Sequence, residues 1–259
     1  MTALTARLRT LYIPPQHRAY TALVGLWMLS MIAVPILRWS FGESILPLTI
    51  NLTVLTQVAA VLSILGAAWG WRHTALALGS VFALGWLVEF IGSHTGFPFG
   101  SYRYTAVLQP QLLGVPLLIP FAWFMMLPPA WAVAQVIVGV NRRAAFIVCS
   151  ALAFTAWDFF LDPQMVTWGI WTWDQPGSYF GIPLVNFFGW VLCAALITMV
   201  VRPQRLPQRS LLLIYGITWL FQTIGLALFW GQPAPAAVGF VLMGIFVGLT
   251  VRTVRKDNR

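Results

Sequence analysis

The sequence predicts an all-α protein, a polytopic bundle of about eight transmembrane helices with both ends of the chain in the cytoplasm. Hydrophobic residues make up 59% of the 259 residues and charged residues only 8%, whereas a soluble domain carries about 25% charged residues. Eight apolar stretches approach or exceed the roughly 20 residues that a helix needs to cross a bilayer. The basic residues fall almost entirely in alternate connections between these stretches. Together these observations indicate an integral membrane protein.

The eight predicted spans follow one another with short or turn-rich connections. The first apolar stretch follows a polar, basic segment of about twenty residues, so we expect a retained span and no cleavable signal peptide. The eighth span is the weakest, because three glycines dilute its apolar character and the connection before it is very short. In chain order the spans are Tyr20–Leu37, Ile45–Trp69, Thr74–Ser93, Leu112–Val140, Ala144–Leu161, Pro183–Val201, Leu211–Trp230 and Ala234–Val251.

The placement of the basic residues tests this count, because cytoplasmic connections are enriched in Lys and Arg. With eight spans and a cytoplasmic amino terminus, only Arg38 and Arg103 fall on the outer side. The inner side holds Arg7, Arg9, Arg18, Arg72, Arg142, Arg143, Arg202, Arg205, Arg209, Arg252, Arg255, Lys256 and Arg259. Seven spans would break this alternation at the carboxyl end. The sequence has no internal repeat, so we expect one integral membrane domain over residues 1–259.

Several classes of protein are excluded by the same residues. The net charge of +9 is spread over separate connections rather than one patch, so we expect no nucleic-acid partner. The two cysteines, Cys149 and Cys193, lie in apolar runs and predict no disulfide framework. The single lysine, Lys256, lies in the tail, which excludes a retinal Schiff base within the bundle. No metal-binding cluster or phosphate-binding loop is present, and we expect neither a metal nor a cofactor.

The chain has six acidic residues, and the positions of three of them are the most informative feature of the sequence. Glu89 lies near the outer end of the third predicted span. Asp158 and Asp162 are four residues apart, on one face of the fifth. All three fall at a similar depth, in the outer third of the bilayer. Because an ionisable group at that depth is costly unless it faces the bundle interior or water, we expect a shared internal cavity. The alternative is that these side chains reach lipid headgroups.

A cavity of this kind favours one reaction in particular. Burial and a neighbouring carboxylate both favour the neutral form of a carboxylic acid, and a buried neutral acid can protonate a carbon–carbon double bond of a lipid. Aromatic rings would then stabilise the carbocation. The alternative for each ring is an interfacial belt that anchors the helices. The candidate lining consists of Trp86, Phe154, Trp157, Trp168, Trp171, Trp173 and Trp190.

Two connections on the outer side carry further candidate residues. Residues 92–104 read GSHTGFPFGSYRY, a glycine- and proline-rich turn that brings His94, Tyr102, Arg103 and Tyr104 to the mouth of the cavity. Here Arg103 either binds a lipid phosphate or pairs with Asp174, and His94 is either catalytic or a capping residue. Residues 168–188 are aromatic and turn-rich, and we expect them to fold back against the bundle with Asp174 and Asn186.

The residues from 85 to 190 resemble a known family. One block comprises Glu89, Gly96, Pro98, Phe99, Gly100, Tyr102, Tyr104, Gly114, Val115, Pro116, Pro120 and Trp123. A second comprises Asp158, Leu161, Asp162, Pro163, Gly169, Trp171, Trp173, Tyr179, Phe180, Gly181, Ile182, Pro183, Asn186, Phe187, Gly189 and Trp190. This combination resembles the membrane carotenoid-biosynthesis family that includes the carotenoid 1,2-hydratases of the CruF type. The first two and last two spans carry no motif of the family.

The resemblance implies a cofactor-independent enzyme in a bacterial or archaeal cytoplasmic membrane. Its reaction would add water to the 1,2 double bond at the acyclic end of a carotenoid such as lycopene or γ-carotene. A carboxyl group of Asp158, Asp162 or Glu89 would protonate C2, and a second carboxylate or His94 would deprotonate the attacking water. The substrate would come from the bilayer through a lateral opening between helices, with membrane lipids as the other partners.

Four other functions remain open at this stage. A lycopene cyclase-like enzyme would attack the same end group but exclude water. A non-catalytic carotenoid or lipid carrier, or a proton-coupled transporter, would use the buried acids without chemistry on carbon. The Asp158–Asp162 spacing is also typical of Mg-diphosphate sites in membrane prenyltransferases, although those sites need more carboxylates and basic partners. The sequence predicts no oligomeric state.

Overall fold

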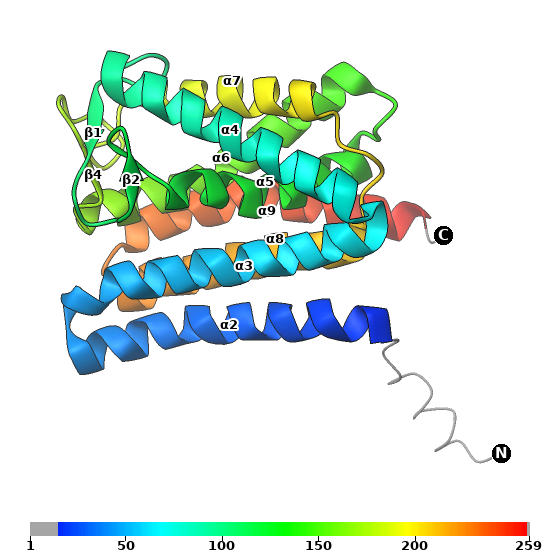
Figure 1. Ribbon diagram of the computed structural model, residues 1–259, viewed down its shortest axis with the longest axis horizontal. Coiled ribbons are helices and arrows are strands. Elements are labelled where there is room, and N and C mark those ends of the chain that lie inside the picture. The colour runs from blue at the N-terminus through cyan, green and yellow to red at the C-terminus, as the bar shows by residue number, and fades with distance from the viewer. Residues whose placement is uncertain (1–14, 258–259) are drawn as a thin grey trace.

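Long helices lying side by side form the body of the protein, and a small cap of strands covers one end (Figure 1). The computed structural model describes the backbone of residues 15–257 and the side chains of residues 20–256. Within that range eight helices are long and apolar enough to cross a membrane, which confirms the predicted all-α, eight-span bundle. They are α2 (Pro15–Phe41), α3 (Leu46–Trp69), α4 (Trp71–Thr95), α5 (Leu118–Ile137), α6 (Arg143–Thr167), α7 (Leu184–Val201), α8 (Gln208–Ile224) and α9 (Pro233–Asp257).

Helix α5 lies at the centre of the bundle. It packs against α3, α4, α6, α8 and α9, and its side chains are almost all buried. Pro129 lies within it and has no N–H, so the carbonyl four residues earlier, that of Met125, lacks its usual helical donor. The side-chain amide of Gln57 in α3 donates to this carbonyl at 3.4 Å. The carbonyl that lacks a helical donor in α5 thus forms a hydrogen bond between α5 and α3.

The fourth span begins later than predicted. Residues 112–117, assigned to the span from Leu112 to Val140, instead belong to a hairpin of β2 (Gln111–Leu112) and β3 (Val115–Pro116). The two turn residues, Leu113 and Gly114, have φ angles of 50° and 80°, a left-handed conformation that suits a two-residue hairpin. Hydropathy alone did not reveal this turn, because most of its residues are apolar.

The fifth span continues further than predicted, to Thr167 rather than Leu161. Asp162 therefore lies well within the helix, on one face with Asp158 as predicted. Pro163 is tolerated because the carbonyl that it leaves without a helical donor, that of Phe159, accepts a hydrogen bond from the Tyr179 hydroxyl at 2.9 Å. This bond also joins the segment between α6 and α7 to the carboxyl-terminal part of α6.

The cap brings together two connections that are far apart in the sequence. Strand β1 (Tyr102–Tyr104) follows α4, strand β4 (Trp171–Trp173) follows α6, and the two pair antiparallel with Arg103 opposite Thr172. Alternate residues of a strand share a face, so Tyr102 and Tyr104 lie on one face, with Trp173 and Trp171 as their respective partners. The expected folding back of residues 168–188 therefore takes the form of a small sheet.

Both the start of α2 and the end of α9 lie at the end of the bundle opposite β1 and β4 (Figure 1). An even number of crossings requires this arrangement. Some side chains used to predict the topology, those of Arg7, Arg9, Arg18 and Arg259, lie outside the described residues, as does that of Asp257. Which end of the bundle faces the cytoplasm stays a prediction.

Close packing between α6 and α9 gives the first testable prediction. A Cβ atom added at Gly239 would lie 2.6 Å from the ring of Phe160, whereas one added at Gly248 on the same helix would meet nothing within 4 Å. Overpacking typically destabilises by about 1–3 kcal/mol. We therefore expect Gly239→Ala to lower the midpoint of thermal unfolding of the purified protein and Gly248→Ala to leave it unchanged or raise it. Equal midpoints for the two variants would contradict this packing.

Candidate active site

Glu89 of α4 is buried and accepts hydrogen bonds from three side chains. The hydroxyl groups of Tyr102 and Tyr104 donate to its Oε2 at 2.5 and 2.7 Å, and the indole N–H of Trp123 donates to its Oε1 at 2.9 Å. The two tyrosines come from β1 and the tryptophan from α5. Each of these neighbours acts as a donor to Glu89, and a carboxylate is a pure acceptor. The three groups therefore form a binding site for the carboxylate form of Glu89.

The local fold explains how β1 reaches Glu89. Helix α4 ends at Gly96, whose left-handed conformation, with a φ of 77°, turns the chain back on itself. Phe99 then packs closely over Gly92, where a Cβ atom would lie only 2.5 Å from its ring. The chain returns along α4, and Tyr102 meets the glutamate two turns before the end of the helix.

The two tyrosines remain hydrogen-bond donors across the physiological pH range. Burial raises the pKa of Tyr102 well above its ordinary value, and the charge of Glu89 raises it further. Tyr104 is affected in the same way, with burial as the largest cause. Neither hydroxyl gives up its proton at neutral pH, so both stay donors to Glu89.

Asp158 and Asp162 lie one helical turn apart on the buried face of α6 and share a single partner. The side-chain N–H₂ group of Asn186 donates to Oδ2 of Asp158 at 3.0 Å and to Oδ2 of Asp162 at 2.5 Å. The indole N–H of Trp171 donates to the other oxygen of Asp162 at 3.1 Å. The second oxygen of Asp158 is buried without a partner among the described residues. One amide thus holds both carboxyl groups together.

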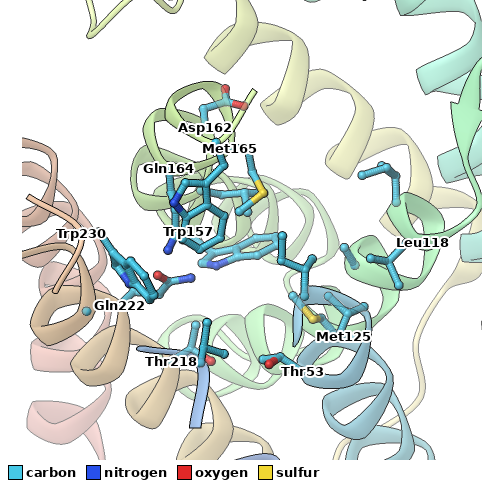
Figure 2. A pocket seen from close by; sticks show the side chains of 18 of the residues that line it. Thr53, Leu118, Met125, Trp157, Asp162, Gln164, Met165, Thr218, Gln222 and Trp230 are labelled. Atoms are coloured by element: carbon cyan, nitrogen blue, oxygen red, sulfur yellow. The ribbon is translucent and has the colours of Figure 1, made fainter. Parts of the chain in front are cut away.

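A cavity of about 470 Å³ adjoins both carboxyl groupings, within the range of small-molecule sites. Glu89, Asp162 and Asn186 line it, whereas Asp158 lies behind them, fully buried. Figure 2 shows Asp162 on one side of the cavity, with Thr53 of α3 and Thr218 of α8 on the other side in this view. The remaining walls are mainly aliphatic and aromatic. The cavity is therefore mainly apolar, with the carboxyl groups of Glu89 and Asp162 in its lining.

Aromatic rings from five elements stand close to the acids. Trp123 of α5 stacks on Trp190 of α7 with ring centroids 4.9 Å apart, and Trp157 meets the edge of Trp190 at 6.1 Å. Trp171 of β4 packs edge-on against Tyr104 at 5.9 Å. Electron-rich ring faces attract cations, most strongly in desolvated sites. The rings of the cavity can therefore stabilise a positive charge near the carboxyl groups.

Comparison with known proteins shows the family of the chain. The chain matches the sequence profile of the family described as carotenoid biosynthesis protein over residues 49–246. The chain belongs to the carotenoid biosynthesis protein family. The family assignment predicted from residues 85–190 is thereby confirmed, and the match extends it to most of the bundle. With its eight apolar helices, this family member is an integral membrane protein.

The chain is also similar to a protein whose name states an activity. Bisanhydrobacterioruberin hydratase of Haloarcula japonica is 32% identical over 133 residues. The match covers 50% of this chain and 45% of that protein, so the chain spans about half of its length. No solved structure matches the chain.

The structure gathers most of the predicted site residues of this family member, but not all. Glu89 and Asp162 line one cavity, with Asp158 immediately behind. Predicted residues that also line it are Tyr102, Tyr104, Trp157, Trp168, Trp171, Trp173, Asn186 and Trp190. Phe154 is buried behind the lining, stacked on Trp190 with centroids 5.2 Å apart.

Four predicted site residues lie away from the cavity. His94 is exposed, bonded to Ser93 and the Phe90 carbonyl, and Trp86 stacks on Phe90 at 5.2 Å. Arg103 and Asp174 form an exposed ion pair on the cap, which is one of the two alternatives that the sequence left open for Arg103. None of the four side chains lines the cavity, so their roles stay predictions.

Other residues of the site had no assigned role at the sequence level. Trp123 belongs to the resemblance pattern, but only the fold shows that it donates to Glu89. The walls contributed by α2, α3 and α8 carry no motif, and a hydropathy pattern cannot separate a cavity-lining apolar side chain from one that faces lipid. These residues could be found only from the packing of the helices.

The shared amide gives the second prediction. Replacing Asn186 with leucine removes the donor common to two buried carboxyl groups, and an unsatisfied buried polar group costs about 1–3 kcal/mol. We expect Asn186→Leu to lower the thermal unfolding midpoint clearly. Asn51→Leu is the matched control, because Asn51 is only part-buried and donates to a single carbonyl of its own helix. If the Asn51 variant lost as much stability as the Asn186 variant, the bridging role would be wrong.

Proposed function

We propose that this protein is a carotenoid hydratase, a hydro-lyase that adds water across the 1,2 double bond at an acyclic carotenoid end group. The observation that carries the proposal is the Asn186-bridged pair of Asp158 and Asp162 beside a cavity walled by tryptophans. Membership in the carotenoid biosynthesis family and the name of the hydratase relative support it. Lycopene and γ-carotene are the proposed substrate type.

Asp162 is the proposed acid because it lines the cavity, whereas Asp158 does not. Two carboxylates that contact one amide nitrogen would repel each other if both were ionised, so one proton held by the pair is the stable arrangement. Both oxygens of Asp162 accept N–H bonds, whereas one oxygen of Asp158 has no partner among the described residues. The resting pair therefore holds its proton on Asp158 and passes it to Asp162, which faces the cavity. Asp158 then acts as the positioning partner that keeps Asp162 supplied with a proton.

Glu89 is the proposed base. Its oxygens are held by donors from β1 and α5, and it lines the same cavity as Asp162. A fixed carboxylate in this position can orient a water molecule and accept its proton. The predicted alternative base, His94, lies outside the cavity and is not part of this proposal.

The proposed reaction balances without a redox partner. The proton of Asp162 adds to C2 using the electron pair of the double bond, which leaves a tertiary cation at C1. The faces of Trp123, Trp157 and Trp190 stabilise this cation. A lone pair of water forms the new C–O bond, and Glu89 takes the proton released by that water. Transfer of this proton back to the aspartate pair restores the starting state.

The proposal also includes the domain organisation, the orientation in the membrane and the source of the substrate. The bundle forms a single domain, and its basic end faces the cytoplasm, where Lys and Arg accumulate. The acid cluster then lies toward the opposite membrane surface, where water can reach it. The proposed setting is a bacterial or archaeal cytoplasmic membrane, with the carotenoid delivered by the bilayer itself.

Amide replacements test the roles of Asp158 and Asp162. General acid catalysis contributes typically 10²–10⁴-fold, so we expect Asp162→Asn to reduce hydration in a lycopene-accumulating host by about 10²-fold or more. Asp158→Asn should reduce it less, since it does not contact the cavity. Asp174→Asn is the control and should retain hydration, because Asp174 is an exposed cap residue. Products are measured by the mass of one added water; full activity of Asp162→Asn would reject this assignment.

A further inference from the structure

The side chains that line the cavity are not all shielded from the surroundings. Most of them are buried or half-buried, but four lining residues are exposed: Ile32 by 48%, Ile36 by 52%, Trp39 by 66% and Ile224 by 38%. Three belong to α2 and the fourth is the last residue of α8. The cavity therefore reaches the surface of the bundle along the seam between α2 and α8.

The two helices of this seam make few contacts with each other. Of the described elements, α2 makes extensive contacts only with α3 and with the short turn η1 (Glu43–Ile45). Helix α8 makes its main contacts with α5, α9 and η2. Figure 1 accordingly shows α2 at the edge of the bundle, beside α3. No extensive packing between the described parts of α2 and α8 closes the cavity on this side.

Contacts between the two helices occur at the outer end of the seam. Trp39 of α2 meets the edge of Phe229 with ring centroids 5.6 Å apart. The Arg38 guanidinium lies over the ring of Trp230 at 5.4 Å, and the same side chain pairs with Glu43 at 2.7 Å. Phe229 ends η2 (Gly225–Phe229), a π-helical turn that continues α8. The outer end of the seam is thus bridged by aromatic rings, while the stretch below it is lined by aliphatic side chains.

We propose that the seam between α2 and α8 is a lateral portal, through which the end of a carotenoid enters the cavity while its polyene chain stays in the bilayer. The proposal rests on the proposed hydratase function. The rim residues Ile32, Ile36, Phe221 and Ile224 are apolar and lie within membrane-spanning segments. The opening therefore faces hydrocarbon rather than water. It leads directly to Asp162 and Glu89, which line the same cavity.

The portal has a consequence for specificity. Because the chain leaves the protein through the seam, the far end of the carotenoid lies in lipid and contacts no part of the cavity. The protein then contacts the acyclic end group and the adjoining part of the polyene, but it does not recognise the opposite end. Substrates that share one acyclic end and differ at the other should be hydrated at that acyclic end with equal rates.

Bulky substitutions on the two sides of the seam test the portal independently. Ile36→Trp narrows it from α2 and Ile224→Trp from α8. The matched controls are Leu29→Trp on α2 and Leu228→Trp on η2, because Leu29 and Leu228 are 64% and 72% exposed and do not line the cavity. Each protein is purified from a lycopene-accumulating host, bound pigment per protein is measured by absorbance, and hydrated pigment in the cells is measured by mass.

The proposal predicts that each portal variant loses bound pigment and hydrated product at least tenfold, while both controls keep wild-type values. Wild-type pigment binding in the two portal variants would overturn it, as would purified wild-type protein that carries phospholipid and no carotenoid. Bound pigment without any hydrated product in the wild type would instead reject the hydratase function and leave the portal supported. A single-peak elution profile identifies folded variants, and two substitutions on different helices keep the test decisive if one fails to fold.

Discussion

The structure depends on how three carboxyl groups are accommodated inside an apolar helical bundle. A buried ionisable group is costly unless polar partners compensate it, and each carboxyl here has partners drawn from a different part of the chain. Asn186 of α7 bridges the two aspartates, and β1 supplies two hydroxyl groups to Glu89. The pairing of β1 with β4 follows from the same need, since these strands carry Tyr102, Tyr104 and Trp171 to the acids.

The two groupings differ in ways that suit different chemical roles. Glu89 is surrounded by donors on both oxygens, an arrangement that holds a carboxylate in place. The aspartate pair shares one amide and leaves an oxygen of Asp158 without a partner among the described residues, an arrangement that accommodates one proton. A site that protonates a double bond and then removes a proton from water needs both kinds of carboxyl group within one cavity. Here Glu89 and Asp162 line one cavity together with tryptophan rings.

The sequence was sufficient for the number of spans and for singling out the carboxyl groups that the fold brings together. Eight apolar stretches and the alternation of basic residues predicted the eight spans, and the spacing of Asp158 and Asp162 placed them on one helical face. Two boundaries were wrong for local reasons: an apolar hairpin at residues 111–116 resembled the start of a helix, and α6 continues through Pro163 because Tyr179 compensates the lost hydrogen bond.

The remaining parts of the site depend on contacts between distant segments, which one sequence does not encode in a readable form. The turn at residues 92–104 suggested that His94 and Arg103 would accompany Tyr102 and Tyr104. Alternation along β1 instead directs the two tyrosines inward and leaves Arg103 in an exposed ion pair. Likewise, no motif distinguishes the α2 residues that line the cavity from those that face only lipid. That distinction depends on how loosely α2 packs beside α8.

The central claim is that a buried carboxylic acid delivers a proton from solvent to carbon. The most direct measurement is the isotopic composition of the product formed by the wild-type protein in deuterated water. We expect one non-exchangeable deuterium on C2, the carbon next to the new alcohol, in every hydrated end group. A hydrated product with no deuterium at that carbon would contradict proton transfer from the aspartate pair, and an isomeric ring without added water would contradict hydration itself.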